Sequence, residues 1–206
     1  MWATHFSSSI AYSRQIQTIL IHSAEKSLPA LSAVLILIAL PNIGLSQLSM
    51  ITRQEALALR FPDAIITSEQ IFLTQEQVEE IERISKVEVK GKLYLRFIAT
   101  KNDQVVGRSY VDTHVVRTKR ESLLISLSPD GHILRIDVTA FLEPPEYVPD
   151  ARWLRQYEGK TVDPSIQLSR AIQPILGATL TSRAVNSAVR RIHAMDAVLE
   201  ASRFGQ

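Results

Sequence analysis

The stretch ESLLISLSPDGHILRIDVTAFL, residues 121–142, decides the fold of this chain. Both of its halves are rich in β-branched and other aliphatic residues, and Pro129-Asp130-Gly131 separates them. Proline presets the backbone for a turn and glycine accepts a positive φ angle, so the stretch predicts a β-hairpin.

The same strand-like pattern extends upstream of the hairpin. VEVKGKLYLRFIAT (87–100) predicts a strand, with Gly91 typical of a bulge or bend. Its alternating apolar residues are Val87, Val89, Leu93, Leu95 and Phe97. The turn residues KND (101–103) lead into QVVGRSYVDTHVVRT (104–118), a second strand region. Because short turns join these consecutive strands, we expect an antiparallel meander.

Two capping boxes predict helices ahead of the meander. They are TRQE (52–55) and TQEQ (74–77), in which a hydroxyl and the side chain three residues later cap the first turn reciprocally. Pro62 should end the first helix near Phe61. The segment AIITSEQIF (64–72) between them is either a strand or an extended link.

The sequence predicts a loop and two helices after the meander. The three prolines of PPEYVP (144–149) indicate a loop or sheet edge, and ARWLRQYEGK (151–160) a short helix ended by Gly159. A long helix should run from about Ser182 to Ser202. Its apolar stripe, at spacings of three and four, consists of Val185, Val189, Ile192, Met195 and Leu199. Off that stripe lie Arg190, Arg191 and Glu200.

These elements define an α+β fold. We expect an antiparallel sheet packed with helices, in which the long C-terminal helix starts after the segment GATLTS (177–182).

Composition excludes several kinds of chemistry. The 206-residue chain has 23 basic and 21 acidic residues, a net charge of +2, and no cysteine. Thiolate catalysis, disulfides and cysteine-held metal centres are therefore excluded, and an exported protein commonly lacks stray thiols. A nucleic-acid-binding domain usually has a strong basic surplus. The densest basic cluster, RTKR (117–120), is more typical of a solvated strand end, so we expect no nucleic-acid partner.

The N-terminal residues 1–46 are set apart from the domain. LPALSAVLILIAL (28–40) is an uncharged, mostly aliphatic run that follows Lys26. A basic flank and about 7–15 apolar residues are typical of a secretory signal. A membrane anchor through residues 28–45 is the alternative, although a span needs about 20 apolar residues; a buried core helix is the third. We expect a signal peptide or anchor over 1–46 and one domain over 47–206.

The segment ILGATLTSRAV (175–185) stands directly before the last amphipathic helix. The N-terminus of a helix has unpaired N–H groups and partial positive charge, and Gly177 and Ala178 leave room for a close ligand. The hydroxyls of Thr179, Thr181 and Ser182 would add polar contacts. These residues are consistent with a phosphate site, but taken alone they favour an ordinary helix cap.

A family resemblance distinguishes between these interpretations. GATLTSRAV (177–185) resembles the flavin-attachment segment of the FMN-binding domain family. The family includes FMN-carrying subunits of Rnf-type and sodium-pumping quinone oxidoreductase complexes, and the N-terminal domain of nitrous-oxide-reductase regulatory proteins. Its pattern is an aspartate, two residues, Ser or Thr, then Gly-Ala-Thr, whose threonine carries FMN through a phosphoester. The resemblance implies that this threonine is Thr179.

The resemblance covers roughly residues 51–200, because further segments match in order and spacing. They are EALALRFPDA (55–64), VVRTKRESLLISLSPDGHI (115–133) and FLEPPEYVPDARWLRQYEGK (141–160). The chain departs from the family pattern at two positions: Gln173 replaces the aspartate, and Leu176 replaces the Ser or Thr. These changes bear on covalent attachment more than on flavin binding.

Further site residues follow from the needs of a flavin, which are a phosphate anchor, a flat apolar slot and polar groups near the ring. The Gly177–Ser182 segment, Leu180 included, would form the anchor. Glu143 and Pro145 match the glutamate and proline of a family Glu-Thr-Pro-Gly segment, and Tyr147 offers a flat face. Arg117 and Thr118 resemble the family's Arg-Thr pair, although Arg117 is equally typical of a solvated or salt-bridged side chain.

Five more residues have alternatives. Trp153 and Tyr157 either cover the ring or belong to the core. Asp112 and His114 alternate on one strand and are typical of surface groups; His193 is typical of a half-buried structural histidine. No metal site and no Ser-His-Asp arrangement is indicated.

The function implied is that of an exported, periplasmic redox carrier with FMN on Thr179. It would relay electrons between protein partners rather than act as an enzyme on its own small substrate. The resemblance also implies a flavin transferase partner that transfers FMN from FAD. The alternative is an exported interaction or regulatory domain of the same fold, with non-covalent FMN or without flavin.

Overall fold

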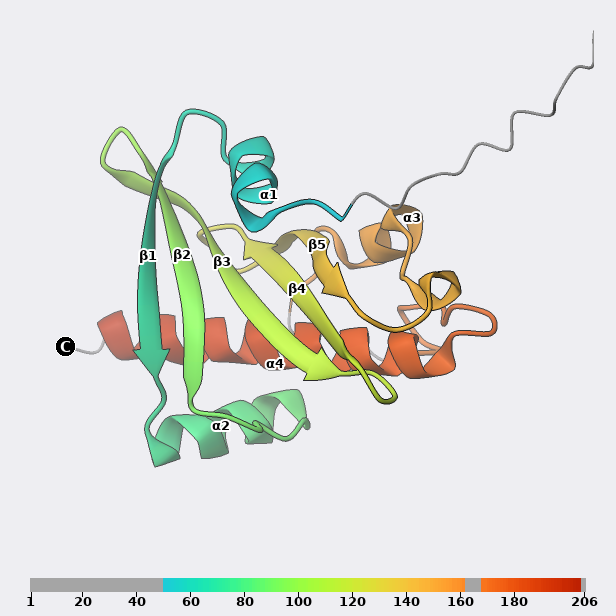
Figure 1. The fold of residues 1–206 in the computed structure, drawn as a ribbon. Helices are drawn as coiled ribbons and strands as arrows, with labels where there is room; N and C mark the ends of the chain where they lie inside the picture. The colour runs from blue at the N-terminus through green and yellow to red at the C-terminus, as the bar shows by residue number, and fades with distance from the viewer. Residues whose placement is uncertain (1–49, 162–167, 205–206) are drawn as a thin grey trace, which may run out of the picture. The chain divides into compact units, whose positions relative to one another are not determined.

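The computed structural model describes residues 50–161 and 168–204. These residues form a five-stranded antiparallel sheet whose strands lie in sequence order, as the meander predicts (Figure 1). The strands are β1 (Ile65–Phe72), β2 (Leu93–Lys101), β3 (Gln104–Val115), β4 (Arg120–Leu127) and β5 (Ile133–Phe141). The α+β prediction is confirmed.

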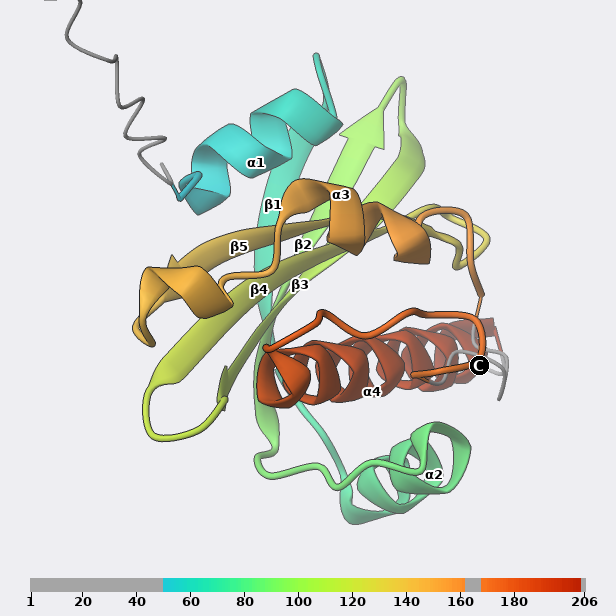
Figure 2. The same cartoon turned by 90° about the vertical axis from the view of Figure 1, so that its right-hand side faces the viewer.

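Helices cover both faces of the sheet. The long helix α4 (Thr179–Phe204) lies along one face with α2 (Gln75–Ser85) beside it, and α1 (Arg53–Arg60) lies on the opposite face (Figure 2). After β5 come the 3-10 turn η1 (Pro145–Tyr147), the short helix α3 (Ala151–Leu154) and the 3-10 turn η2 (Arg155–Tyr157). Both α3 and η2 pack against β5.

The main hydrophobic core lies between the sheet and α4. The predicted stripe of α4 is buried there: Val185, Val189, Ile192, Met195 and Leu199. A smaller core under α1 contains Leu57, Phe61 and Leu124.

Both predicted capping boxes are present. The Thr52 hydroxyl accepts a hydrogen bond from the Glu55 N–H at 3.2 Å, while the Glu55 carboxylate accepts one from the Thr52 N–H at 2.9 Å. The second box, at the start of α2, is closed in the same reciprocal way. α1 ends at Arg60 with Phe61 as its cap, as Pro62 predicts.

The hairpin prediction is also confirmed. β4 and β5 pair antiparallel, and Gly131 adopts a φ of +86° in the turn between them. The ambiguous segment 64–72 contains a true strand, β1, which pairs with β2 along its whole length. The loop predicted at 144–149 contains only the single turn η1, and Gly159 follows η2 with a φ of +73°.

The strand predicted from Val87 begins later, at Leu93. The intervening residues are held against the end of α2 instead. The Val89 N–H donates to the Glu82 carboxylate at 2.8 Å, and the Val87 N–H donates to the Ser85 hydroxyl at 3.1 Å. Gly91 therefore lies outside the strand, and the irregularity of β2 falls between Ala99 and Thr100.

α4 begins at Thr179, three residues before the predicted start at Ser182. Gly177, with a φ of +80°, ends the preceding loop and lets the chain enter the helix early. Arg191 lies off the apolar stripe yet is buried, with 8% of its surface exposed, because an acidic partner faces it from the sheet.

The predicted signal peptide or anchor at 1–46 lies outside the described residues. Within the described parts of the chain, no helix is long and apolar enough to cross a membrane.

Candidate functional site

Three segments that are distant in sequence meet at the N-terminus of α4 and enclose a pocket of about 160 Å³, here called the small pocket. They are the β3–β4 turn, the loop after β5, and the first turn of α4. The small pocket is lined by Val116, Arg117, Glu143, Tyr147, Gly177, Ala178, Thr179, Leu180 and Thr181. All of these except Val116 were predicted from the sequence as cofactor-binding residues.

No side chain among residues 50–161 and 168–204 caps the first turn of α4. Ala178 precedes the helix, and its methyl group cannot accept a hydrogen bond. Among the described residues, none accepts a hydrogen bond from the backbone N–H groups of Thr179, Leu180 or Thr181. These three N–H donors, which have no acceptor within the described parts of the chain, and the positive end of the helix dipole therefore lie at the small pocket.

Ser182 supports this turn from below rather than lining the pocket. Its buried hydroxyl accepts a hydrogen bond from the Ile175 N–H at 2.8 Å and donates one to the Ala178 carbonyl at 3.1 Å. These bonds fix the loop that leads into Gly177. Thr179 itself is exposed, so its hydroxyl is accessible from solvent.

Glu143 organises the opposite wall. One of its carboxylate oxygens accepts hydrogen bonds from the backbone N–H groups of Thr118 and Lys119, both at 2.7 Å, and of Arg117 at 3.2 Å. These donors hold the pKa of Glu143 below its usual value. The carboxylate thus fixes the β3–β4 turn, and Thr118 contributes through its backbone without lining the pocket.

Arg117 is the cation of the small pocket. Its guanidinium carbon lies 5.8 Å from the centre of the Tyr147 ring, a cation–π arrangement that joins the β3–β4 turn to the loop after β5. Pro145 is exposed next to Tyr147 but does not line the pocket.

Trp153 and Tyr157 belong to the core, which is the second of the two interpretations of this pair. The Trp153 indole donates a hydrogen bond to the Gln173 carbonyl at 2.6 Å, and the Tyr157 hydroxyl donates to Asn186 at 3.2 Å. Trp153 lines neither pocket near Thr179. It instead helps to hold the backbone of Gln173 and so the approach to the GATLTS segment.

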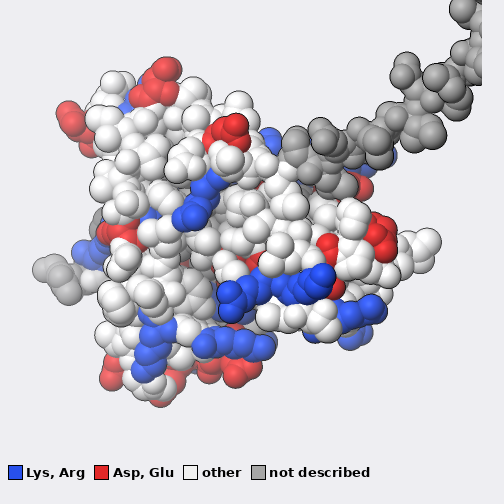
Figure 3. Space-filling view, in the orientation of Figure 1, with Lys and Arg blue, Asp and Glu red and all other residues white. Residues whose placement is uncertain are grey.

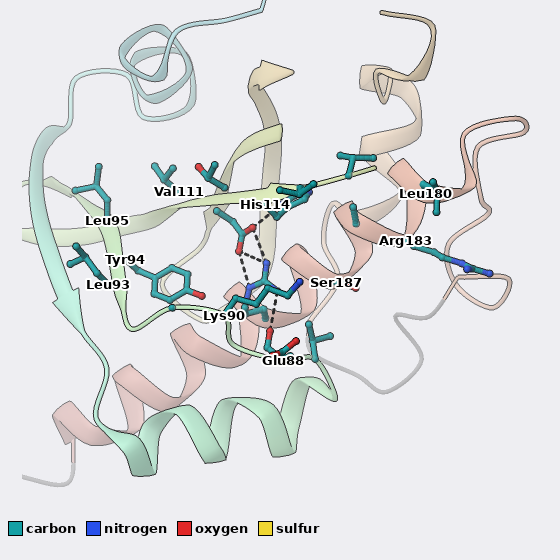
Figure 4. Close-up of a pocket in the computed structure, with 18 of the residues that line it drawn as sticks. Glu88, Lys90, Leu93, Tyr94, Leu95, Val111, His114, Leu180, Arg183 and Ser187 are labelled. Atoms are coloured by element: carbon teal, nitrogen blue, oxygen red, sulfur yellow. Dashed lines mark hydrogen bonds and ion pairs between the residues drawn. The ribbon is translucent and has the colours of Figure 1, made fainter. Parts of the chain in front are cut away.

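A second, larger pocket of about 860 Å³ adjoins the small pocket and shares Val116 and Leu180 with it (Figure 4). Its walls come from the ends of β2 and β3, the link between α2 and β2, and the first turns of α4. The apolar residues of the wall include Leu93, Tyr94, Leu95, Val111 and Val115. The volume falls within the ~300–1,000 Å³ typical of small-molecule sites.

A buried ionic cluster forms part of the wall of the larger pocket. Arg191 makes a bidentate ion pair with Asp112, with contacts of 2.7 and 2.9 Å, and Asp112 also contacts His114 at 2.8 Å. His114 in turn contacts Glu121 at 2.9 Å. The expectation that Asp112 and His114 are surface groups is wrong, because these long-range partners bury Asp112 to 1% exposure and leave the His114 side chain only 12% exposed.

A second buried network fixes α4 further along. Asp196 accepts hydrogen bonds from Arg108 at 2.5 and 2.8 Å and from the Tyr110 hydroxyl at 2.7 Å. Glu200 accepts one from Arg96 at 2.9 Å. Burial raises the pKa of Tyr110, which stays protonated as a donor.

The sequence analysis missed both networks. Two features of the sequence could have indicated them. Polar and charged residues occur on β2 and β3 at positions that face the core, and basic and acidic residues flank the apolar stripe of α4. His193 is more buried than expected, with 7% of its surface exposed, and burial lowers its pKa.

Among the described residues, no group of three or more His, Asp or Glu side chains is arranged to hold a metal ion. Charged side chains of both signs occur on the face shown in Figure 3, and neither sign covers it. The RTKR segment at 117–120 is exposed, as expected of a strand end.

No protein-family model matches the chain, and neither does any curated protein. Among solved structures, the chain is similar to NqrC of Shewanella oneidensis, with a TM-score of 0.46 and 14% sequence identity. The match covers 71% of this chain and 88% of that one. A likeness at this level concerns the general course of the chain and says nothing about a ligand.

Proposed function

We propose that this chain carries one FMN, with its phosphate at the N-terminus of α4 and Thr179 as the point of covalent attachment. The observation that carries the proposal is the composition of the small pocket. Residues picked from three separate sequence segments line one cavity, in which uncapped N–H groups, Arg117 and an accessible threonine hydroxyl come together. Backbone donors, a guanidinium and the helix dipole are the groups that bind phosphate.

The ring system would occupy the larger pocket. The two pockets share Val116 and Leu180, so a phosphate in one lies next to an aromatic ring in the other. Apolar residues from β2 and β3 provide a surface for the ring, and Tyr147 remains at the phosphate end. When bound, FMN supplies one- or two-electron chemistry, while the protein supplies position and electrostatics.

The biological role that fits is electron relay between redox protein partners. We further propose that residues 47–206 form the FMN-binding domain of an exported, periplasmic protein. In this proposal residues 1–46 are its signal peptide or membrane anchor, and a flavin transferase attaches the FMN.

The test is intact mass spectrometry of the chain co-expressed with a flavin transferase and exported, followed by peptide mapping across 171–183. We expect an added mass of one FMN less water, localised to Thr179. Thr179→Ala should abolish the addition. Thr118→Ala, which removes an exposed hydroxyl outside both pockets, is the matched control and should retain it. An unmodified wild type, or an addition that persists in Thr179→Ala, would refute the attachment.

Non-covalent FMN is the second candidate, and two residues favour it. Leu176, at the family's Ser or Thr position, is fully exposed and offers no hydrogen bond. Gln173, at the aspartate position, is held through its backbone by Trp153 and Gln156. Flavin absorbance that separates from the chain on unfolding would support this candidate, whereas a colourless wild type would support a flavin-free domain.

A further inference from the structure

His114 is the member of the buried ionic cluster that stands between two carboxylates. Its Nδ1 lies 2.8 Å from an Asp112 oxygen, and its Nε2 lies 2.9 Å from a Glu121 oxygen. A neutral imidazole has a single N–H and can donate to only one of them, whereas an imidazolium donates to both. Burial lowers the pKa of His114, but the hydrogen bonds to Asp112 and Glu121 outweigh burial and raise this pKa to about 9.

Each cation of the cluster has a carboxylate as its counter-charge. Asp112 is already neutralised by its bidentate pair with Arg191, which leaves Glu121 as the counter-charge of His114. Burial raises the pKa of Glu121, and its second oxygen has no hydrogen-bond partner among the described residues. The cluster therefore holds its proton on the pocket side, because His114 lines the larger pocket and Glu121 does not.

The remaining wall of the larger pocket is also more basic than acidic. Lys90 from the α2–β2 link and Arg183 from α4 face the pocket, against Glu88 as the one further acid. Tyr94 from β2 interacts with both Arg191 and Asp112, and burial raises its pKa, so it adds no negative charge. With His114 protonated, the wall is positive overall, and loss of the proton would remove one of its charges.

We propose that the His114 imidazolium, in the wall of the larger pocket, offsets negative charge that accumulates on an electron-rich ring bound there. The inference rests on the proposed function, in which the FMN ring occupies this pocket. Two electrons from a redox partner protein and one proton from solvent leave the reduced ring with one negative charge. His114 keeps its own proton and stabilises that charge relative to the oxidised ring.

The first experiment examines the chain prepared without FMN. Imidazole ¹⁵N NMR of wild type should give a titration midpoint for His114 near pH 9, and Glu121→Gln should lower it. His132, which pairs with Asp130 and does not line the larger pocket, provides an internal comparison. A His114 midpoint at or below about 6.5, the ordinary histidine value, would overturn the inference.

The second experiment measures the preference for reduced over oxidised FMN, through the midpoint potential of the loaded protein. His114→Gln should weaken the preference about tenfold at pH 7, or about 30 mV for a two-electron couple. The difference from wild type should shrink as the pH rises past about 9, where His114 loses its proton. His132→Gln, the matched control outside the pocket, should behave as wild type.

The two levels of the proposal fail in different ways. Equal potentials in wild type and His114→Gln would refute the role of His114 while leaving FMN binding intact. A wild type that binds no FMN at all would refute the proposed function, and the role of His114 with it.

Discussion

The contacts of His114 with Asp112 and Glu121 should make the stability of this protein depend on pH in the alkaline range. The pKa of His114 is raised to about 9 in the folded chain, from about 6.5 in an unfolded one. A group whose pKa is higher in the folded state stabilises that state fully below its unfolded pKa. The contribution is lost as the pH rises from about 6.5 through about 9.

The size of the effect follows from the difference between the two pKa values. Each unit of pKa corresponds to about 1.4 kcal/mol, so complete deprotonation of His114 lowers the free energy of unfolding by about 3 kcal/mol. Asp112 does not titrate in this range, because the pKa of its carboxyl is lowered. Urea unfolding at constant ionic strength, from pH 6 to pH 10, measures the change directly.

The diagnostic quantity is the difference between wild type and His114→Gln. Glutamine keeps a hydrogen-bond donor but cannot take up a proton, so the variant should be less stable near pH 6 and approach wild type near pH 10. His132→Gln removes a half-buried histidine beside an aspartate and should leave the profile unchanged. A wild-type advantage over His114→Gln that stays constant across the range would refute the reasoning.

Two substitutions test local packing by urea denaturation, one in the smaller core under α1 and one at the start of α4. Gly107→Ala should lower the free energy of unfolding by about 1–3 kcal/mol, because the new Cβ would lie 2.3 Å from the Phe61 ring. Gly91→Ala, whose Cβ would meet nothing within 4 Å, is the control and should change it by less than about 1 kcal/mol. Ser182→Ala should cost about 1–3 kcal/mol, because the Ile175 N–H loses its acceptor, and should also weaken FMN retention; full stability in this variant would show that the bond is dispensable.

The parts of the fold that the sequence predicts well are those with local causes. The capping box at Thr52, the stop at Pro62 and the hairpin at Gly131 each depend on residues within about four positions of one another. The alternating pattern from Val87 predicted a strand that starts too early, because a contact from outside the pattern decides where the strand begins. The side chain of Glu82, on the preceding helix, captures the backbone of Val89 before a strand can begin.

The candidate site likewise has one part that local sequence motifs predict and one part that they do not. The small pocket was predictable because the GATLTS segment, Arg117 and Glu143 belong to recognisable motifs whose spacing resembles one family. The ionic cluster was not predictable, because two of its members, Asp112 and Arg191, are 79 positions apart in the sequence. Only the register of β3 against α4 brings them together, and no local pattern encodes that register.

The two networks and the small pocket have a common consequence for α4. Arg191, Asp196 and Glu200 tie successive turns of the helix to β2 and β3. Removing one member of such a buried pair typically costs about 3–5 kcal/mol, so these contacts fix where the helix lies. A helix held so firmly along its length does not need a side-chain cap to stay in place. Its first turn, from Thr179 to Thr181, is therefore free to present uncapped N–H groups to a phosphate.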